Sequence, residues 1–313
     1  MTEIDLIVNQ FILEEGKLYT LPELYHQLEE KILSNTSSID EIGQIISTDA
    51  TLSAKILKIA NSALYGFRAE VSTLNRALNL IGVEEVKNLI LLDTLAGQFN
   101  DANPCAALKM DDFWRRSVYL ALISKRLSKR LKHSDADRLF ISAIMSRLGQ
   151  LVCCSTRSNE VAQILNEHIN QPDEIEFDIE INCLGFTYNV VSAKILEYWK
   201  VPKEIIVSLQ YLHEPLNAPE DIRNSYLEDL LILNVATIYS GILEQDELHT
   251  DSDLQESGEL IIEPTESYLA RVNPAINEAL NIDKNTVDDI LFEIEMDALE
   301  ILGIIFPKSS LIF

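Results

Sequence analysis

Apolar residues recur every three or four positions along most of the chain, which is the spacing of an amphipathic helix. Leu24, Leu28 and Ile32 share one helical face, and Leu52 and Ile56 begin another such face. The spacing predicts helices at about 21–32, 38–46, 49–61, 73–82, 86–92, 111–131, 135–152, 160–170, 189–199, 203–213, 226–243, 266–280 and 286–304.

Several of these boundaries carry a capping signal. Ser38 is followed three residues later by Glu41, which is the spacing of a capping box. Thr48 or Asp49 is placed to cap the next helix, and Gly82 stands where a helix would end in a positive-φ conformation. We therefore expect an all-α fold with short connections.

Composition agrees with this fold class and suggests where it divides. Of 313 residues, 47% are apolar, while only 10 are Gly and 9 are Pro, which argues against a turn-rich β protein. The segment 100–104 reads as a loop between two helical parts. From 244 to 266 there are nine acidic residues and no Lys or Arg, so we expect a solvated loop there.

The chain shows no signal for a membrane or for secretion. No apolar run reaches the roughly 18 residues that span a bilayer, and residues 1–11 lack a basic leader region. The four cysteines show no CxxC pair, so we expect reduced thiols and neither a disulfide framework nor a zinc site. A cytoplasmic location is the resulting prediction.

The charge is strongly negative and unevenly distributed. The net charge is −25, but 109–147 carries +6, because ten Lys and Arg face four Asp and Glu there. So acidic a surface argues against nucleic acid and anionic membranes as partners. The basic stripe Lys125–Lys132 has two readings: a solvated face that pairs with the protein's own acids, or a docking surface for an acidic partner or nucleic acid.

The run IISTDATLSAKILKIANSALYG at 45–66 resembles the first half of the HDOD domain family. The family's "ANSA.YG" pattern is met by Asn61, Ser62, Tyr65 and Gly66, and a second family stretch is matched at 72–89. The resemblance covers about 18–215. The motif residues suit a helix end and its turn, with Asn61 as an alternative contact to a partner or ligand.

HDOD domains resemble HD-type metal-dependent phosphohydrolases, and the resemblance implies where the metal ligands of that fold would stand. The first His position is taken by Arg116. In place of the "HDIGKL" motif the chain reads SRLGQL, with Ser146, Arg147 and Gln150 at the His, Asp and Lys positions.

Two later ligand positions are also altered. Tyr188 stands where another His is expected, and the paired His stretch reads Leu212-His213-Glu214-Pro215, which leaves His213 alone. A catalytic divalent metal needs at least three protein ligands, and a guanidinium has no lone pair to offer. The resemblance therefore implies no metal, no cofactor and no hydrolase activity.

We expect a helical N-terminal half at 1–100, a degenerate HD-like core at 101–245, and an acidic loop with C-terminal helices at 246–313. The expected function is a non-catalytic signalling module with a signalling protein as partner. Three alternatives stay open: a residual metal-dependent phosphohydrolase, a nucleotide-binding protein, and a nucleic-acid-binding regulator.

Arg116 and Arg147 replace ligands of one metal centre, so their guanidinium groups are expected to be close enough to bind a small anionic ligand together. The alternative is that each pairs with a local carboxylate.

Overall fold

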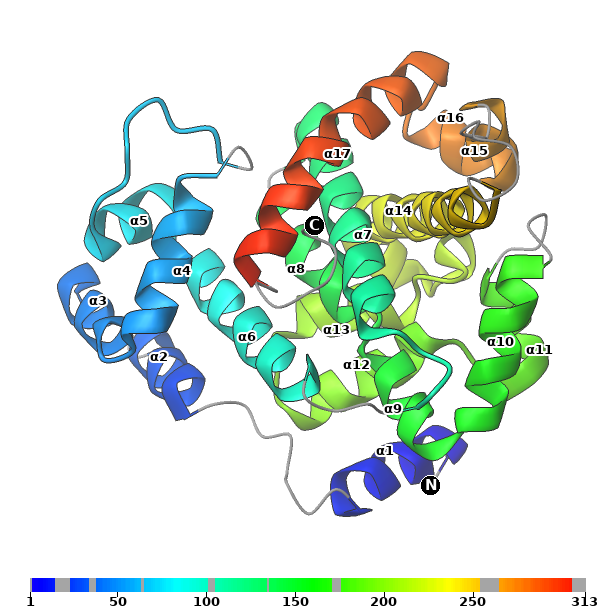
Figure 1. Ribbon diagram of the computed structural model, residues 1–313, viewed down its shortest axis with the longest axis horizontal. Coiled ribbons are helices and arrows are strands. Elements are labelled where there is room, and N and C mark those ends of the chain that lie inside the picture. Colours follow the sequence, from blue (N-terminus) through cyan, green and yellow to red (C-terminus); the bar gives the residue numbers. More distant parts are fainter. Residues whose placement is uncertain are drawn as a thin grey trace. The chain divides into compact units, whose positions relative to one another are not determined.

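A computed structural model describes residues 2–14, 23–33, 38–62, 65–100, 105–133, 135–170, 176–253 and 265–305 (Figure 1). Within these ranges the chain forms helices and no strand, so the predicted all-α fold class is confirmed. The helices follow one another through short turns. Their amphipathic faces meet to form the apolar core.

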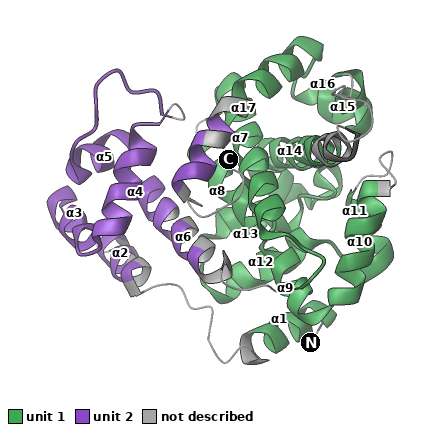
Figure 2. Ribbon diagram, in the orientation of Figure 1, with its two compact units in different colours: residues 1–16, 103–294 green, residues 17–102, 295–313 purple. Residues whose placement is uncertain are grey.

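The chain forms two compact units, one of 1–16 with 103–294 and the other of 17–102 with 295–313 (Figure 2). This division differs from the expected three parts. The first helix, α1 (Glu3–Glu14), belongs with the larger unit because it buries Ile7, Val8 and Phe11 there, against α9 and α12. The sequence analysis predicted no helix at this position.

The smaller unit contains five helices before its C-terminal segment. They are α2 (Glu23–Leu33), α3 (Ile39–Ser47), α4 (Ala50–Ala60), α5 (Leu74–Ile81) and α6 (Val83–Asn100). The capping box at Ser38 and Glu41 is present in both directions, and Asp49 rather than Thr48 caps α4. Gly82 ends α5 with φ 101°, as predicted.

The larger unit is built around two helices, α7 (Met110–Arg130) and α14 (Glu220–Asp253), which pack together and against α8. Its other elements are α8 (Ala136–Met145), α9 (Leu148–Thr156), α10 (Ser158–Asn170), α11 (Glu176–Leu184), α12 (Tyr188–Tyr198), α13 (Lys203–Gln210), the 3₁₀ turn η1 (Pro215–Asn217), α15 (Thr265–Arg271) and α16 (Pro274–Ala279). Helix α17 (Lys284–Ile305) begins in this unit and ends in the smaller one.

The single helix expected at 135–152 is two helices, α8 and α9, with a break at Ser146 and Arg147. The Ser192 hydroxyl bridges the break: it donates to the Ser146 carbonyl and accepts from the Gly149 N–H, both at 2.7 Å. Gly149 also lies so close to α12 that a Cβ there would stand 2.0 Å from the Tyr188 carbonyl oxygen. A side chain at position 149 would not fit, because α9 and α12 meet there.

Two expectations for the C-terminal part were wrong. The segment expected to be a loop from 244 continues α14 as far as Asp253, and Glu244 and Gln245 are buried. Positions 254–264 lie outside the described residues. The helix expected at 266–280 is divided between α15 and α16, because Pro274 cannot donate a backbone hydrogen bond and starts a new helix, which Asn273 caps.

Two stretches, Ala136–Thr156 and Glu220–Gln245, are long and apolar enough to cross a membrane by length and composition alone. In the folded chain 89% and 72% of their apolar windows are buried. Most of their apolar surface is thus buried inside the protein.

Candidate functional site

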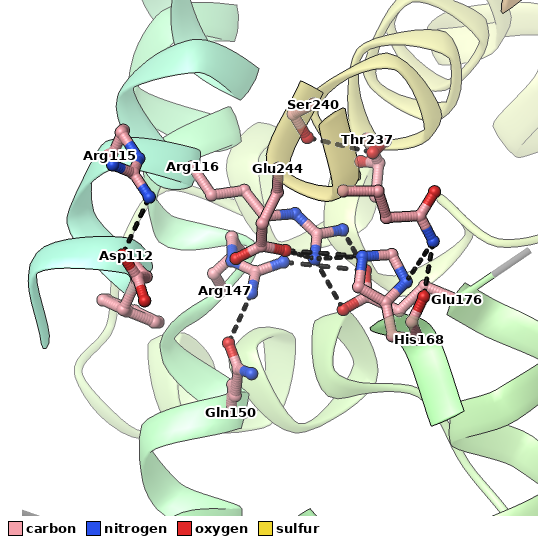
Figure 3. Close-up of polar contacts among 12 residues, drawn as sticks. Asp112, Arg115, Arg116, Arg147, Gln150, His168, Glu176, Thr237, Ser240 and Glu244 are labelled. Carbon is pink, nitrogen blue, oxygen red and sulfur yellow. Dashed lines mark hydrogen bonds and ion pairs between the residues drawn. The ribbon is translucent and has the colours of Figure 1, made fainter. Parts of the chain in front are cut away.

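Arg116 of α7 lies fully inside the larger unit and is held by two carboxylates (Figure 3). Its Nη1 donates to Glu176 Oε1 at 2.9 Å and its Nη2 donates to Glu176 Oε2, so the pair is two-pronged. Nη1 also donates to Glu244 Oε2 at 2.6 Å. Glu176 opens α11 and Glu244 lies on α14, so this one guanidinium joins three helices.

Arg147, at the break before α9, reaches the same carboxylate. Its Nη1 lies 3.6 Å from Glu176 Oε2, and its Nη2 donates to Gln150 Oε1 at 2.5 Å. The guanidinium groups of Arg116 and Arg147 therefore converge on one anion, and that anion is a carboxylate. The anion between them is a side chain of the chain itself.

His168 of α10 completes the cluster on the side of α14. Its Nε2 lies 3.4 Å from Glu244 Oε2, and its backbone carbonyl accepts from Gln245 Nε2 at 2.6 Å. Gln245 in turn accepts from Arg271 of α15 at 2.8 Å. A chain of hydrogen bonds thus connects the buried cluster with α15.

Burial and charge act against each other in this cluster. Burial favours neutral carboxyls, but Arg116, followed by other cations, holds the pKa of both Glu176 and Glu244 below the ordinary value. Burial and the neighbouring Arg116 lower the pKa of Arg147. Two guanidinium groups therefore face two carboxylates, and the cluster is close to neutral.

Glu180, one turn after Glu176, is the exception among the acids. Burial first, and repulsion by Glu176 second, raise the pKa of Glu180 well above its ordinary value. Its Oε2 accepts the backbone N–H of Tyr188 at 2.6 Å. This environment favours the protonated carboxyl, since a third negative charge would have no matching cation.

The space around the cluster is small. One cavity of about 20 Å³ is lined by Arg116, His168 and Glu176 among others, and another of about 10 Å³ by Arg147, Glu176 and Glu180 among others. A single water needs roughly 10–15 Å³ on this measure. The described residues thus leave no room for a nucleotide or a phosphate ester at the cluster.

The expected cleft residues are only partly brought together. Ser146, Arg147, Tyr188 and Leu212 line the smaller cavity. Arg116 joins them through Glu176, and Gln150 joins them through Arg147. Gln150 and Tyr188 are buried, and burial raises the pKa of the Tyr188 hydroxyl.

His213 faces a different space. It lines an open cleft of about 280 Å³ together with Asp178, Asn234 and Arg271 among others. Its ring lies 5.0 Å from that of Phe177, centroid to centroid, and burial lowers the pKa of the imidazole.

These residues do not fit a catalytic metal. The acids that could bind one, Glu176 and Glu244, are already paired with Arg116, and a dication beside that guanidinium would be repelled. In the described part of the chain, no three His, Cys, Asp or Glu side chains come together as a metal-binding group.

The residues of the family motif, in the smaller unit, form hydrogen bonds within the turn that follows α4. The Asn61 side chain donates to the carbonyls of Leu57 and Val71, both at 2.8 Å, and accepts the Val71 N–H at 2.7 Å. It thereby fixes the turn that follows α4. Ser62 Oγ donates to the Ile59 carbonyl at 2.7 Å.

Tyr65 and Gly66 continue this arrangement. The Tyr65 hydroxyl donates to Glu85 Oε1 at 2.9 Å, and Gly66 has φ 58°. The motif therefore stabilises a turn.

The basic stripe Lys125–Lys132 pairs with the protein's own acids. Lys125 is buried and lies 2.6 Å from Asp137. Arg126 lies 3.2 Å from Glu293, and Arg130 3.0 Å from Asp289.

Sequence reasoning missed the acids that fill the site. Glu176 and Glu180 lie on α11, where Phe177, Ile179 and Ile181 alternate with polar residues and give no helical signal. Glu244 was assigned to the loop. One sequence signal could have indicated that acids lie in the site. Arg116 and Arg147 stand at positions expected in the core, and a buried guanidinium requires a carboxylate beside it.

Comparison with known proteins identifies a family and a shared fold. A family model described as HDOD domain matches residues 18–215. An uncharacterized protein of Treponema pallidum (strain Nichols) is 21% identical over 206 residues, which is 65% of this chain and 39% of that protein. The chain thus spans about two fifths of the length of that curated relative.

Three solved structures share the fold. An HDOD domain protein with unknown function from Geobacter sulfurreducens has TM-score 0.64 and 17% identity, covering 98% of this chain and 97% of the other. A protein of Shewanella amazonensis SB2B, provisionally named a phosphohydrolase, has TM-score 0.65 and 19% identity over 96% and 97%. One of Marinobacter aquaeolei VT8, provisionally named a signal transduction protein, has TM-score 0.61 and 17% identity over 96% and 64%.

Proposed function

This chain belongs to the HDOD domain family, and from that membership we propose that it is a non-catalytic regulatory module that acts through contacts with a signalling protein partner. The carrying observation is the pair of arginines at former metal-ligand positions, both in contact with Glu176. The arginines provide the positive charge that a metal would otherwise provide, and Glu176 occupies the place of an anionic substrate. The name of the Marinobacter protein agrees with a regulatory role.

The absence of hydrolysis follows from the chemistry of the site. A metal-dependent phosphohydrolase lowers the pKa of a bound water to make the attacking hydroxide. Here His213 is the one histidine among the five positions where the resemblance expects a histidine ligand, and it lines a separate cleft. Without a metal the cluster holds no group that would activate water against a phosphate.

A small anionic ligand, if one regulates the module, is proposed to bind at the His213 cleft. Such a ligand would not bind between Arg116 and Arg147, because it would have to displace Glu176 from two buried cations. The His213 cleft has more room and includes Arg271, which is connected to the buried cluster through Gln245.

Nucleic acid is a poor candidate partner, since residues of the basic stripe are paired with acids and the net charge is −25. We propose a cytoplasmic protein of bacterial regulation, in line with the bacterial sources of the structural relatives.

The test separates this module from a residual phosphohydrolase. The full chain is incubated with Mn²⁺, Fe²⁺ or Zn²⁺, freed of excess metal, and assayed for bound metal and for hydrolysis of mono- and diester phosphates, cyclic dinucleotides among them. We expect neither stoichiometric metal nor turnover. The His213→Ala variant is the matched control, because only an enzyme with metal at His213 would lose metal and rate. Stoichiometric metal with a turnover that this variant abolishes would overturn the proposal.

A further inference from the structure

Two buried thiols of the larger unit lie in direct contact. Cys105 Sγ and Cys154 Sγ are 2.7 Å apart, and both cysteines are free. A disulfide bond is about 2.05 Å long, so the two sulfur atoms need to approach by roughly 0.7 Å to bond. Cys105 and Cys154 are the two cysteines that make a thiol–thiol hydrogen bond among the described residues.

The surroundings of the pair differ between its two members. Cys105 lies in the turn before α7, below the exposed Ala106 and Ala107. The contact with Cys154 and the N–H groups of Leu108 and Ala107 lower the pKa of Cys105 to about 6 against the effect of burial. Cys154 lies within α9, and its pKa is raised by Cys105 and by burial. The position of Cys105 beside an exposed turn, together with its lowered pKa, favours Cys105 as the nucleophile and Cys154, inside α9, as the thiol that resolves it.

We propose that Cys105 and Cys154 form an oxidisable pair, which a small peroxide converts into an intrachain disulfide. The Cys105 thiolate attacks one peroxide oxygen, the O–O bond breaks, and the other oxygen leaves as water after taking up a proton. Cys154 sulfur then attacks the sulfenic acid, the S–O bond breaks, and a second water leaves with the Cys154 proton. Two thiols lose two electrons to one peroxide, and two waters form.

The position of the pair suggests what the bond would change. Cys105 lies five residues before α7, which carries Arg116, and Cys154 lies near the end of α9, which begins just after Arg147. The disulfide would join the two segments that bring the arginines to Glu176. Oxidation would therefore act as an input to the module, and this inference stands whether or not the protein hydrolyses a substrate.

Competition among the four thiols gives the proposal its specificity. Burial raises the pKa of Cys153, so its thiol is not activated although it neighbours Cys154. Burial and Glu167 raise the pKa of Cys183 on α11, which is the most accessible of the four. Bulky alkylating agents should therefore react first with Cys183, because its thiol is the most accessible. Peroxide should oxidise Cys105 first, because oxidation follows thiolate character.

The experiment maps the oxidised bond in the full chain. The reduced protein is treated with hydrogen peroxide, its remaining thiols are alkylated, and it is digested without reductant for mass spectrometry. We expect a peptide pair joined through Cys105 and Cys154, lighter by two hydrogen atoms than the reduced peptides, and restored by dithiothreitol. The oxidised protein should also unfold at a higher denaturant concentration, because the bond closes a 49-residue loop.

Variants distinguish this pair from other oxidation chemistry. Cys153→Ser and Cys183→Ser should retain the cross-link. Cys154→Ser should lose it and leave Cys105 as a sulfenic acid that a 1,3-dione reagent traps. Mapping of the unmodified chain decides the matter even if that variant fails to fold. Four reduced thiols after peroxide treatment, a bond through Cys153 or Cys183, or Cys105 found only as sulfinic acid would each overturn the proposal.

Discussion

Arg116 and Glu176 form a buried two-pronged ion pair between helices α7 and α11, at a position where the catalytic relatives of this fold are expected to bind metal. The side chains are 1% and 6% exposed. A pair so deeply buried is costly to break, because either partner alone would be an uncompensated charge in the core. The pair therefore holds α7 and α11 together inside the larger unit.

Glu176→Gln should destabilise the protein by about 3–5 kcal/mol, because it leaves Arg116 and Arg147 with one carboxylate fewer at nearly unchanged volume. Urea unfolding measures this change. The exposed pair of Arg157 and Glu3, 2.9 Å apart, is the matched control. Glu3→Gln should cost less than about 1 kcal/mol. Equal effects of the two variants would show that the buried pair is not structural.

Glu180→Gln should stabilise the protein at alkaline pH and much less at acid pH. The pKa of Glu180 is raised on folding, so the wild type loses stability as the pH rises from the unfolded pKa towards the folded one. The amide cannot ionise, and its oxygen can still accept the Tyr188 N–H. Urea midpoints at about pH 5 and about pH 8 test this. A variant that is destabilised equally at both values would contradict a protonated Glu180.

Asn61→Ala should cost about 2 kcal/mol, because three hydrogen bonds that fix the turn after α4 disappear together. Asn79 is the control, since it is exposed on α5 and its side chain donates one bond to the Asn75 carbonyl. Asn79→Ala should change the unfolding midpoint little. If Asn61→Ala were as mild, the turn after α4 would not depend on these three hydrogen bonds.

Gly149→Ala should destabilise by about 1–3 kcal/mol or more, because the new methyl group would press on the Tyr188 backbone and separate α9 from α12. Apart from the neighbouring backbone of its own helix, Gly97 in α6 has no atom within 4 Å of the place of its Cβ. Gly97→Ala should therefore be neutral or stabilising by up to about 1 kcal/mol through helix propensity. Thermal unfolding of both variants gives the comparison. A tolerated Gly149→Ala would mean that the two helices do not pack as closely as described.

The sequence by itself determined the helical fold and most of its boundaries. Caps such as Ser38 and Asp49 depend on residues three or four positions away, so their chemistry is local and readable. It also indicated that two positions aligned with metal ligands hold residues that cannot bind a metal, since Arg116 and Arg147 have no electron pair to donate whatever surrounds them.

Only the tertiary structure decided which residues surround Arg116 and Arg147. Arg116 meets Glu176 across 60 positions and Glu244 across 128, and no local pattern selects these two among 50 acidic residues. The same is true of Cys105 and Cys154, which are 49 positions apart. Periodicity reports which face of a helix is buried, but the partner of a buried charge or thiol is set by how distant helices pack.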